Sequence, residues 1–255
     1  MNLQLNQLLG TEYKSGPQRI RVITEDWVGE NLYCPYCGQD HISHFENNRP
    51  VADFFCPKCS EEFELKSNAK KIAGEIQDGA YATMLDRIQS VNNPNLFLMK
   101  YSSLNMSVED FMVVPKYFFV EDIIIKRKPL AATARRAGWT GCKIAIDRVP
   151  DEGKIYLIKE SRPVSCEEVI QKVYRTHFIA KCKLDARGWI LDVLNCLGKI
   201  PENEFTLDRV YSFADDLQLR HPDNHHVHDK IRQQLQLLRD KGIIEFVGRG
   251  RYKKI

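Results

Sequence analysis

Residues 53–66 read Asp53-Phe54-Phe55-Cys56-Pro57-Lys58-Cys59-Ser60-Glu61-Glu62-Phe63-Glu64-Leu65-Lys66, and this stretch decides the fold. Its Cys-x-x-Cys pair lies between an aspartate and a Glu-x-Lys triplet. Another Cys-x-x-Cys pair, Cys34-Pro35-Tyr36-Cys37, stands upstream of it. The cysteines predict one metal site, and the acidic residues around the second pair predict a chemically different site beside it.

The cysteine spacing is typical of a structural zinc site. Eighteen residues separate Cys37 from Cys56, within the range for paired Cys-x-x-Cys motifs that bind zinc. Each pair supplies two thiolates from one tight turn, so four sulfurs close around the ion and leave no open position. We therefore expect Cys34, Cys37, Cys56 and Cys59 to hold Zn²⁺ for stability rather than for catalysis. The alternative, two unrelated cysteine pairs in the core, does not explain the spacing.

The carboxylates and the lysine predict a magnesium site. On a strand, Glu64 and Lys66 project from one face, with Phe63 and Leu65 on the other. Asp53 would lie on an antiparallel partner strand beside Glu64, with the second cysteine pair in the turn. Two close carboxylates repel each other unless a cation lies between them, and Mg²⁺ prefers such oxygen ligands.

A bound Mg²⁺ acidifies water and neutralises charge on a phosphate. Lys66 would then orient the attacking water, help to deprotonate it or stabilise the developing charge, and the pattern does not choose among these roles. Alone, the pattern is weak, because Glu and Lys alternate on many exposed strands. Its position beside a zinc motif favours the catalytic interpretation.

The composition limits where nucleic acid can bind. The chain has 255 residues, 43% of them apolar, and a formal net charge of only +3, so it carries no general basic coat. Local clusters exist at Lys126–Arg136 and Arg249–Lys254, although such runs are often plain solvated surface. The polar N-terminus lacks a secretory signal, and no apolar run spans a bilayer. We therefore expect a cytoplasmic protein without a membrane partner, in which disulfides are unusual and Cys142, Cys166, Cys182 and Cys196 are buried thiols.

The chain divides into two predicted domains. Residues 1–182 alternate strands and helices, with apolar strands at 96–99, 111–114 and 153–158, which indicates an α/β (α+β) fold. We expect helices over 1–33, 71–89 and 166–178, since apolar residues recur at helical spacing in 71–89.

Residues 183–255 read as a winged helix-turn-helix domain. Three helices are expected: one over 187–197, one capped by Thr206, and one that opens at 222–224 and ends at Lys241-Gly242. A hairpin over 243–253 follows, with Arg249 and Arg251 around Gly250. A purely structural three-helix domain is the alternative, but the arginine-tipped wing favours DNA.

Several segments resemble the DpnI family of restriction endonucleases. The resemblance covers essentially the whole chain and is carried by Asn47–Phe54, Cys59–Ser67, Asp78–Met84, Thr133–Trp139 and Lys230–Gln236. It implies a PD-(D/E)XK nuclease core with an inserted four-cysteine zinc site and a C-terminal winged helix. It also implies a type II, methyl-directed enzyme that cuts duplex DNA at GATC carrying N6-methyladenine. One departure is that the Pro-Asp pair of the motif reads Pro50-Val51-Ala52-Asp53 here.

Carried over position by position, the resemblance assigns the site residues. Asp53, Glu64 and Lys66 match the catalytic residues, and the four cysteines match the zinc ligands. We expect Asp53, Glu64 and the main-chain carbonyl of Leu65 to hold the catalytic Mg²⁺.

The DNA-contacting residues are predicted in both domains. In the first, they are Arg135, Arg136 and Trp139, with a core position as the alternative for Trp139. In the second, they are His225, His226, His228, Arg232, Gln233, Arg249 and Arg251. For the histidines, an exposed helix start is favoured over base contact.

Two other functions are compatible with these motifs. One is a non-catalytic zinc-ribbon and winged-helix regulator that binds DNA, and the other is a zinc-stabilised protein-interaction module. The sequence leaves the oligomeric state open, with a monomer as one option, and it also leaves open the number of catalytic metal ions and the position of the cut.

Overall fold

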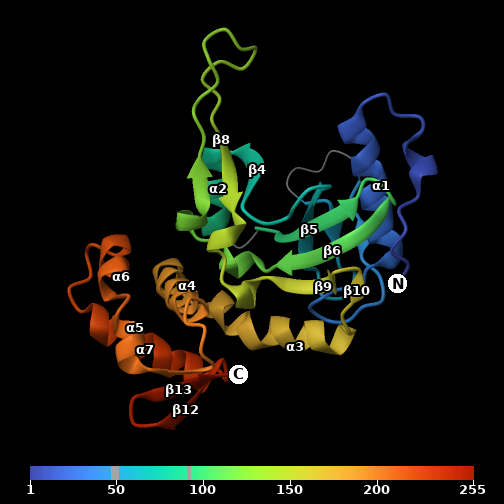
Figure 1. Cartoon of the computed structure of the whole chain (residues 1–255). Coiled ribbons are helices and arrows are strands. Elements are labelled where there is room, and N and C mark those ends of the chain that lie inside the picture. Colours follow the sequence, from blue (N-terminus) through green and yellow to red (C-terminus); the bar gives the residue numbers. More distant parts are fainter. Residues whose placement is uncertain (47–51, 91–92) are drawn as a thin grey trace.

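A seven-stranded sheet forms the centre of the computed structural model, which describes residues 1–46, 52–90 and 93–255 (Figure 1). Within this part of the chain the strand order is β1-β2-β3-β5-β6-β9-β10, and only the β3–β5 pair is parallel. The strands are β1 (Ser43–His44), β2 (Phe54–Phe55), β3 (Glu62–Asn68), β5 (Asn95–Ser102), β6 (Ser107–Val114), β9 (Ile155–Lys159) and β10 (Arg162–Pro163). The predicted strands at 96–99, 111–114 and 153–158 are therefore confirmed.

Side-chain alternation divides the core between the two faces of this sheet. Phe97 and Met99 of β5 face one cluster, which also contains buried residues of α1 (Gly16–Asn31) and α3 (Cys166–Thr176). Leu96 and Leu98 face the other cluster. Strand β3 follows the same rule, because Phe63 is buried with Phe97 while Glu64 and Lys66 project from the opposite face.

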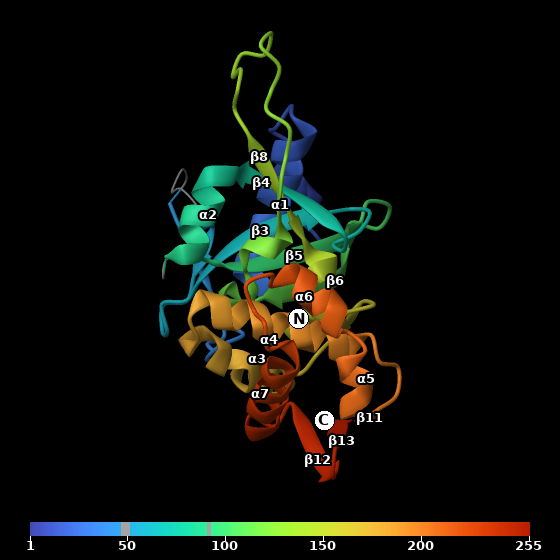
Figure 2. The same ribbon diagram turned by 90° about the vertical axis from the view of Figure 1, so that its left-hand side faces the viewer.

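A smaller antiparallel sheet and α2 (Tyr81–Gln89) lie over that opposite face. The sheet order is β4-β8-β7, with β4 (Glu75–Ala80), β8 (Gly141–Ala145) and β7 (Ile124–Lys126). Between β7 and β8, residues 127–140 form a long arm that stands away from the molecule (Figures 1 and 2). The single helix predicted over 71–89 is wrong, because its first half is strand β4. Ile72 and Ile76 do meet the core, but as parts of a loop and an edge strand.

Short 3-10 turns connect many of these elements. They are η1 (Gln7–Gly10), η2 (Lys116–Phe118), η3 (Glu121–Ile123), η4 (Ile146–Arg148), η5 (Asp151–Gly153) and η6 (His177–Lys181). The helix predicted over 1–33 is shorter than expected, because α1 begins only at Gly16, where Pro17 occupies the first turn. Among the described residues, no helix is both long and apolar enough to span a bilayer.

The C-terminal part is a helical module with a small three-stranded sheet. Its helices are α4 (Leu184–Gly198), α5 (Leu207–Tyr211), α6 (Ala214–Arg220) and α7 (Val227–Asp240). Its strands, in the order β11-β13-β12, are β11 (Glu204–Thr206), β13 (Arg251–Lys254) and β12 (Ile244–Gly248). Thr206 caps α5 as predicted, accepting a hydrogen bond from the Arg209 amide.

Helix α7 ends at Asp240, and the predicted stop follows it, with Lys241 as the C-cap and Gly242 at a φ of 67° that suits a glycine. The start predicted at 222–224 is wrong, because α7 begins at Val227. His225 therefore precedes the helix, and His226 occupies its N-cap position.

One hydrophobic core extends from the first part of the chain into the C-terminal module. Trp189 and Ile190 of α4 are buried in the same cluster as Tyr117 and Phe118 of η2. The Asn195 side chain also donates a hydrogen bond of 2.9 Å to the Arg148 carbonyl. The C-terminal module is therefore packed against the rest of the protein rather than tethered to it.

Within the module, Asp192 of α4 holds the end of α6. Its carboxylate accepts hydrogen bonds of 2.8 Å from Arg220 and 2.8 Å from His221. The His221 ring stacks on Trp189 with their centroids 3.9 Å apart.

Replacing Phe97 by alanine should destabilise the fold by about 3–5 kcal/mol, because the ring is fully buried and stacked on Phe63 at 4.3 Å. Urea unfolding followed by circular dichroism measures this change. The matched control is Tyr174→Ala on α3, where the side chain is 81% exposed. That variant should stay within about 0.5 kcal/mol of the wild type. A Phe97→Ala protein as stable as the control would contradict the packing described here.

Candidate functional site

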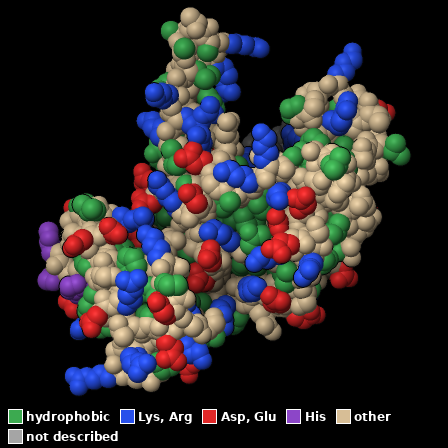
Figure 3. Space-filling view, viewed as in Figure 1, with side chains coloured by type: hydrophobic (Ala, Val, Ile, Leu, Met, Phe, Trp, Pro, Cys, Tyr) green, Lys and Arg blue, Asp and Glu red, His purple; other side chains and the backbone are tan. Residues whose placement is uncertain are grey.

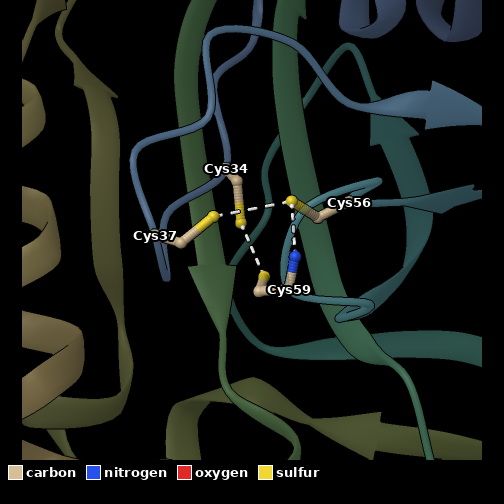
Figure 4. Close-up of side chains that lie close together, drawn as sticks. All are labelled: Cys34, Cys37, Cys56 and Cys59. Carbon is tan, nitrogen blue, oxygen red and sulfur yellow. Dashed lines mark hydrogen bonds between the residues drawn. The ribbon is translucent and has the colours of Figure 1, made fainter.

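The four predicted cysteines come together at one point. Their sulfur atoms all lie within 4.8 Å of one another, and Cys34 and Cys56 are buried. The Cys34 and Cys59 sulfurs are 3.6 Å apart, and those of Cys37 and Cys56 are 3.5 Å apart (Figure 4). A tetrahedral zinc with bonds of about 2.3 Å requires sulfurs about 3.8 Å apart. The arrangement therefore fits Zn²⁺, and these thiolates would hold it in a closed site.

The two Cys-x-x-Cys pairs, Cys34–Cys37 and Cys56–Cys59, form two knuckles with the same local turn. The amides of Gly38 and Ser60 each donate 2.9 Å hydrogen bonds, to the carbonyls of Cys34 and Cys56 respectively. Both residues have positive φ, 71° for Gly38 and 61° for Ser60. A serine rarely adopts this conformation. The repeated geometry is evidence that the turns are shaped to point two sulfurs inward.

The second knuckle closes the hairpin that carries the acidic residues. Its Cys56 amide donates to the Glu61 carbonyl at 2.9 Å, and β2 then pairs with β3 so that Phe54 lies opposite Phe63. One step before β2, the Asp53 amide donates to the Phe63 carbonyl at 2.9 Å. The predicted hairpin is therefore present, and it brings Asp53 next to the Glu-x-Lys strand.

Asp53 is fixed from two sides. Its Oδ2 accepts a 2.8 Å hydrogen bond from the Leu65 amide, and its Oδ1 lies 3.5 Å from the Arg21 guanidinium. Arg21 also pairs with Glu25 at 2.5 Å, so α1 contributes a second acidic residue near Asp53. The Pro50-Val51 part of the same motif lies outside the described residues.

Glu64 and Lys66 belong to a chain of four alternating charges. The Lys66 Nζ lies 2.6 Å from Glu64 Oε1 and 2.9 Å from Asp78 Oδ1. On the other side, Arg87 of α2 lies 3.3 Å from Glu64 Oε2. This charge chain therefore consists of the side chains of Asp78, Lys66, Glu64 and Arg87, in that order. It connects β4, β3 and α2.

Burial and these neighbours act against each other on the titrating groups. Burial raises the pKa of Glu64, whereas the positive charge of Lys66 lowers it. Burial is the larger effect, so the pKa of Glu64 is raised. Burial alone would lower the pKa of Lys66, but Glu64 and Asp78 outweigh it and raise the pKa well above its usual value. Lys66 is therefore an ammonium group at neutral pH.

The predicted catalytic residues open onto one cleft. It has a volume of about 1160 Å³, and its lining includes Asp53, Glu64 and Lys66. On the side formed by α1, the cleft is lined by Arg21 and Glu25. On the side formed by the connection between β3 and β4, it is lined by two further lysines, Lys70 and Lys71. The arrangement places carboxylate oxygens, which suit a hard divalent cation, beside cations that suit phosphate.

Six charged residues of this site were missed by sequence reasoning, namely Arg21, Glu25, Lys70, Lys71, Asp78 and Arg87. Asp78 belongs to the segment Asp78–Met84, which carries part of the resemblance to the DpnI family. No other feature of the sequence indicated any of these residues. The contacts of Asp78 and Arg87 are made across two sheets and a helix, so no local spacing predicts them.

The arm carries the DNA-contacting residues predicted in the first domain. Arg135 and Arg136 are exposed, and the Arg136 guanidinium lies over the Trp139 ring, 4.8 Å from its centroid. Trp139 is half-buried at the base of the arm and belongs to neither core cluster. Figure 3 shows blue Lys and Arg side chains along the arm, on one side of a hollow.

The residues predicted in the C-terminal module form a separate surface. His225, His226, His228, Arg232 and Gln233 are all exposed. Tyr211 organises two of them, because its hydroxyl accepts a hydrogen bond from Arg232 and its ring lies 4.3 Å from that of His228.

Figure 3 shows the histidines gathered on the outer face of this module, away from the arm. At the wing, Arg249 is exposed, while Arg251 lies 3.5 Å from Glu204.

Fold and site together define a mixed α/β protein with a four-cysteine cluster and a helix-turn-helix module that indicates DNA as its partner. A model of the DpnI family, described as the Dam-replacing family, matches residues 1–182. A second model, DpnI_C, described as the Dam-replacing HTH domain, matches residues 185–254. The chain belongs to the DpnI family, as the motifs indicated, and this membership implies a methyl-directed restriction endonuclease.

The cysteine cluster generates a test by metal analysis. Purified protein should contain one zinc per chain, and Cys56→Ser should lose most of it, because a structural site needs all four thiolates. Inductively coupled plasma mass spectrometry measures the zinc, and a thermal melt should show the accompanying loss of stability. Cys182→Ser, outside the cluster, should keep the metal. Full zinc retention by Cys56→Ser would show that these sulfurs are not the ligands.

Proposed function

We propose that this chain is a magnesium-dependent type II endonuclease with a PD-(D/E)XK core, acting on GATC sites in duplex DNA that carry N6-methyladenine. The observation that carries the proposal is the convergence of Asp53, Glu64 and Lys66 on one cleft from a single hairpin. Membership of the DpnI family supports the substrate, and the GATC sequence rests on that membership alone.

The donor set fits Mg²⁺. Asp53 and Glu64 present carboxylate oxygens to one cleft, and we assign them, with the Leu65 carbonyl, as the ligands. A cation between them would offset the burial that raises the pKa of Glu64. When bound, Mg²⁺ supplies Lewis acidity, which lowers the pKa of a ligand water and neutralises phosphate charge.

Lys66 supplies a positive hydrogen-bond donor in this proposal. Its ammonium is held by Glu64 and Asp78, and their charges raise its pKa. A protonated lysine suits the roles of orienting the attacking water and stabilising negative charge that develops on the phosphate. It does not suit the role of general base in the state described here.

The surroundings of the cleft suit a DNA backbone. Lys70 and Lys71 line it, and the arm between β7 and β8 carries the basic residues Arg127, Lys128, Arg135 and Arg136. Phosphate contacts of this kind supply much of the affinity and make it strongly dependent on salt. We assign the hollow between the arm and α1 (Figures 1 and 3) as the binding site of the duplex.

Methyl recognition requires more than burial of the methyl groups. One buried methyl contributes about 0.8 kcal/mol, which is about fourfold in affinity. The two methyls of a palindrome give about fifteenfold on the same scale. Sharper discrimination requires a second reading surface, or a pocket with polar groups that stay unpaired when the methyl is missing.

The chain offers two such surfaces. We propose the arm with Trp139 as the first, belonging to a catalytic domain of residues 1–182. The second is the surface around α7, belonging to a winged-helix domain of residues 183–255.

The proposal is tested with one plasmid prepared from adenine-methylating and non-methylating hosts. In Mg²⁺ the protein should cut the methylated plasmid only, and cutting should stop when the divalent ion is chelated. Gel electrophoresis gives the result directly. Equal cutting of both plasmids would refute methyl direction. No cutting of either would favour the alternative of a DNA-binding regulator.

Lys66→Ala should abolish cleavage while DNA binding remains, because many other contacts hold the duplex. Rates from labelled duplexes and affinities from fluorescence anisotropy separate the two effects. The matched control is Lys172→Ala on the exposed face of α3. This variant removes an equal charge at a residue that does not line the cleft. Cleavage by Lys66→Ala at the rate of this control would rule out the assigned role.

A further inference from the structure

Asp78 is the least explained member of the charge chain around Lys66. Its side chain is only 4% exposed, yet it lies outside the D…E-x-K pattern. Oδ1 pairs with Lys66 at 2.9 Å, whereas Oδ2 is buried without a hydrogen-bond partner among the described residues. Burying a carboxylate with one oxygen unpaired costs free energy, so fold stability alone does not account for an aspartate here.

Asp78 lies on the inward face of strand β4, two residues after the core-facing Ile76, and a bulge follows it directly. The β4–β8 register is regular from Glu75 to Asp78 and then shifts between Asp78 and Ala80, around Gly79. Bulges of this kind bend a strand and redirect a side chain, and they are frequent beside active sites. Asp78 therefore reaches from the smaller sheet to Lys66 on the central sheet.

Lys66 has two carboxylate partners, and they have different roles in the proposed reaction. Glu64 is one of the proposed Mg²⁺ ligands, so its oxygens are shared between the ion and the lysine. Asp78 is not among those ligands, and its pairing with Lys66 does not compete with them. Arg87 similarly holds Glu64 from the side away from Lys66, 3.3 Å from Oε2.

We propose that Asp78 is the positioning residue for Lys66, fixing the ammonium group at the cleft independently of Glu64. This inference rests on the proposed function, because it assigns a role within that reaction. Asp78 acts through Lys66 and need not touch DNA. Supporting groups of this kind matter because a misplacement of about 1 Å in a catalytic group costs about 10²-fold in rate.

Asp78→Asn tests the proposal, because it keeps the shape and removes the charge. We expect kcat on methylated duplex to fall roughly 10- to 100-fold. KM should stay within about twofold, because ground-state DNA contacts are intact. DNA affinity by anisotropy and the thermal midpoint should match the wild type. The control is Asp86→Asn on the exposed side of α2, which removes an equal charge without touching Lys66.

Asp78→Glu keeps the carboxylate and should recover part of the lost kcat. A kcat within twofold of the wild type for Asp78→Asn would overturn the proposal. So would a loss of DNA binding or of the folded state in both variants, because Asp78 would then be structural. If the wild type itself does not cut methylated DNA, the failure is that of the proposed function instead.

Discussion

The register of the β2–β3 hairpin is the constraint on which the site depends. The second cysteine knuckle closes the turn, and the Asp53 amide bonds to the Phe63 carbonyl at 2.9 Å. A shift of one residue would move every side chain of a strand to the other face of its sheet. Glu64 and Lys66 would then enter the aromatic cluster around Phe97, and Phe63 would enter the cleft. The sulfur cluster and the aromatic core thus select the same register, and this register brings Asp53, Glu64 and Lys66 to one cleft.

The cysteine cluster and the cleft differ in their chemistry. The four cysteine sulfurs form a compact cluster within a segment whose strands, β1 and β2, have only two residues each. Such short strands provide few ladder hydrogen bonds, and a zinc ion bound by these sulfurs would hold the hairpin together. The cleft instead carries the carboxylates of Asp53 and Glu64 beside the ammonium groups of Lys66, Lys70 and Lys71. A candidate structural metal site and a candidate catalytic site are therefore built from neighbouring residues of different types along one stretch of chain.

Local patterns predicted much of this architecture. The spacing of Cys34, Cys37, Cys56 and Cys59 and the alternation in 62–66 predicted the cluster and the hairpin, because both depend on residues close in sequence. The helix over 71–89 was wrong, since Ile72, Ile76 and Ala80 match helical spacing even though this segment is a loop and an edge strand. Asp78 and Arg87 could not be predicted as partners of Lys66 and Glu64, because the packing of the smaller sheet and α2 on the central sheet brings them together. The Tyr211 contacts to His228 and Arg232 are likewise tertiary.

The central claim is that Asp53 and Glu64 share a divalent cation in the cleft, and a crystal structure with a methylated duplex and Mn²⁺ tests it most directly. Data collected at the manganese edge distinguish this ion from zinc at the cysteine cluster. The account predicts a manganese peak bounded by the two carboxylates and the Leu65 carbonyl, next to a DNA phosphate. A duplex seated in the cleft with manganese elsewhere, or with the two carboxylates turned away from each other, would contradict it.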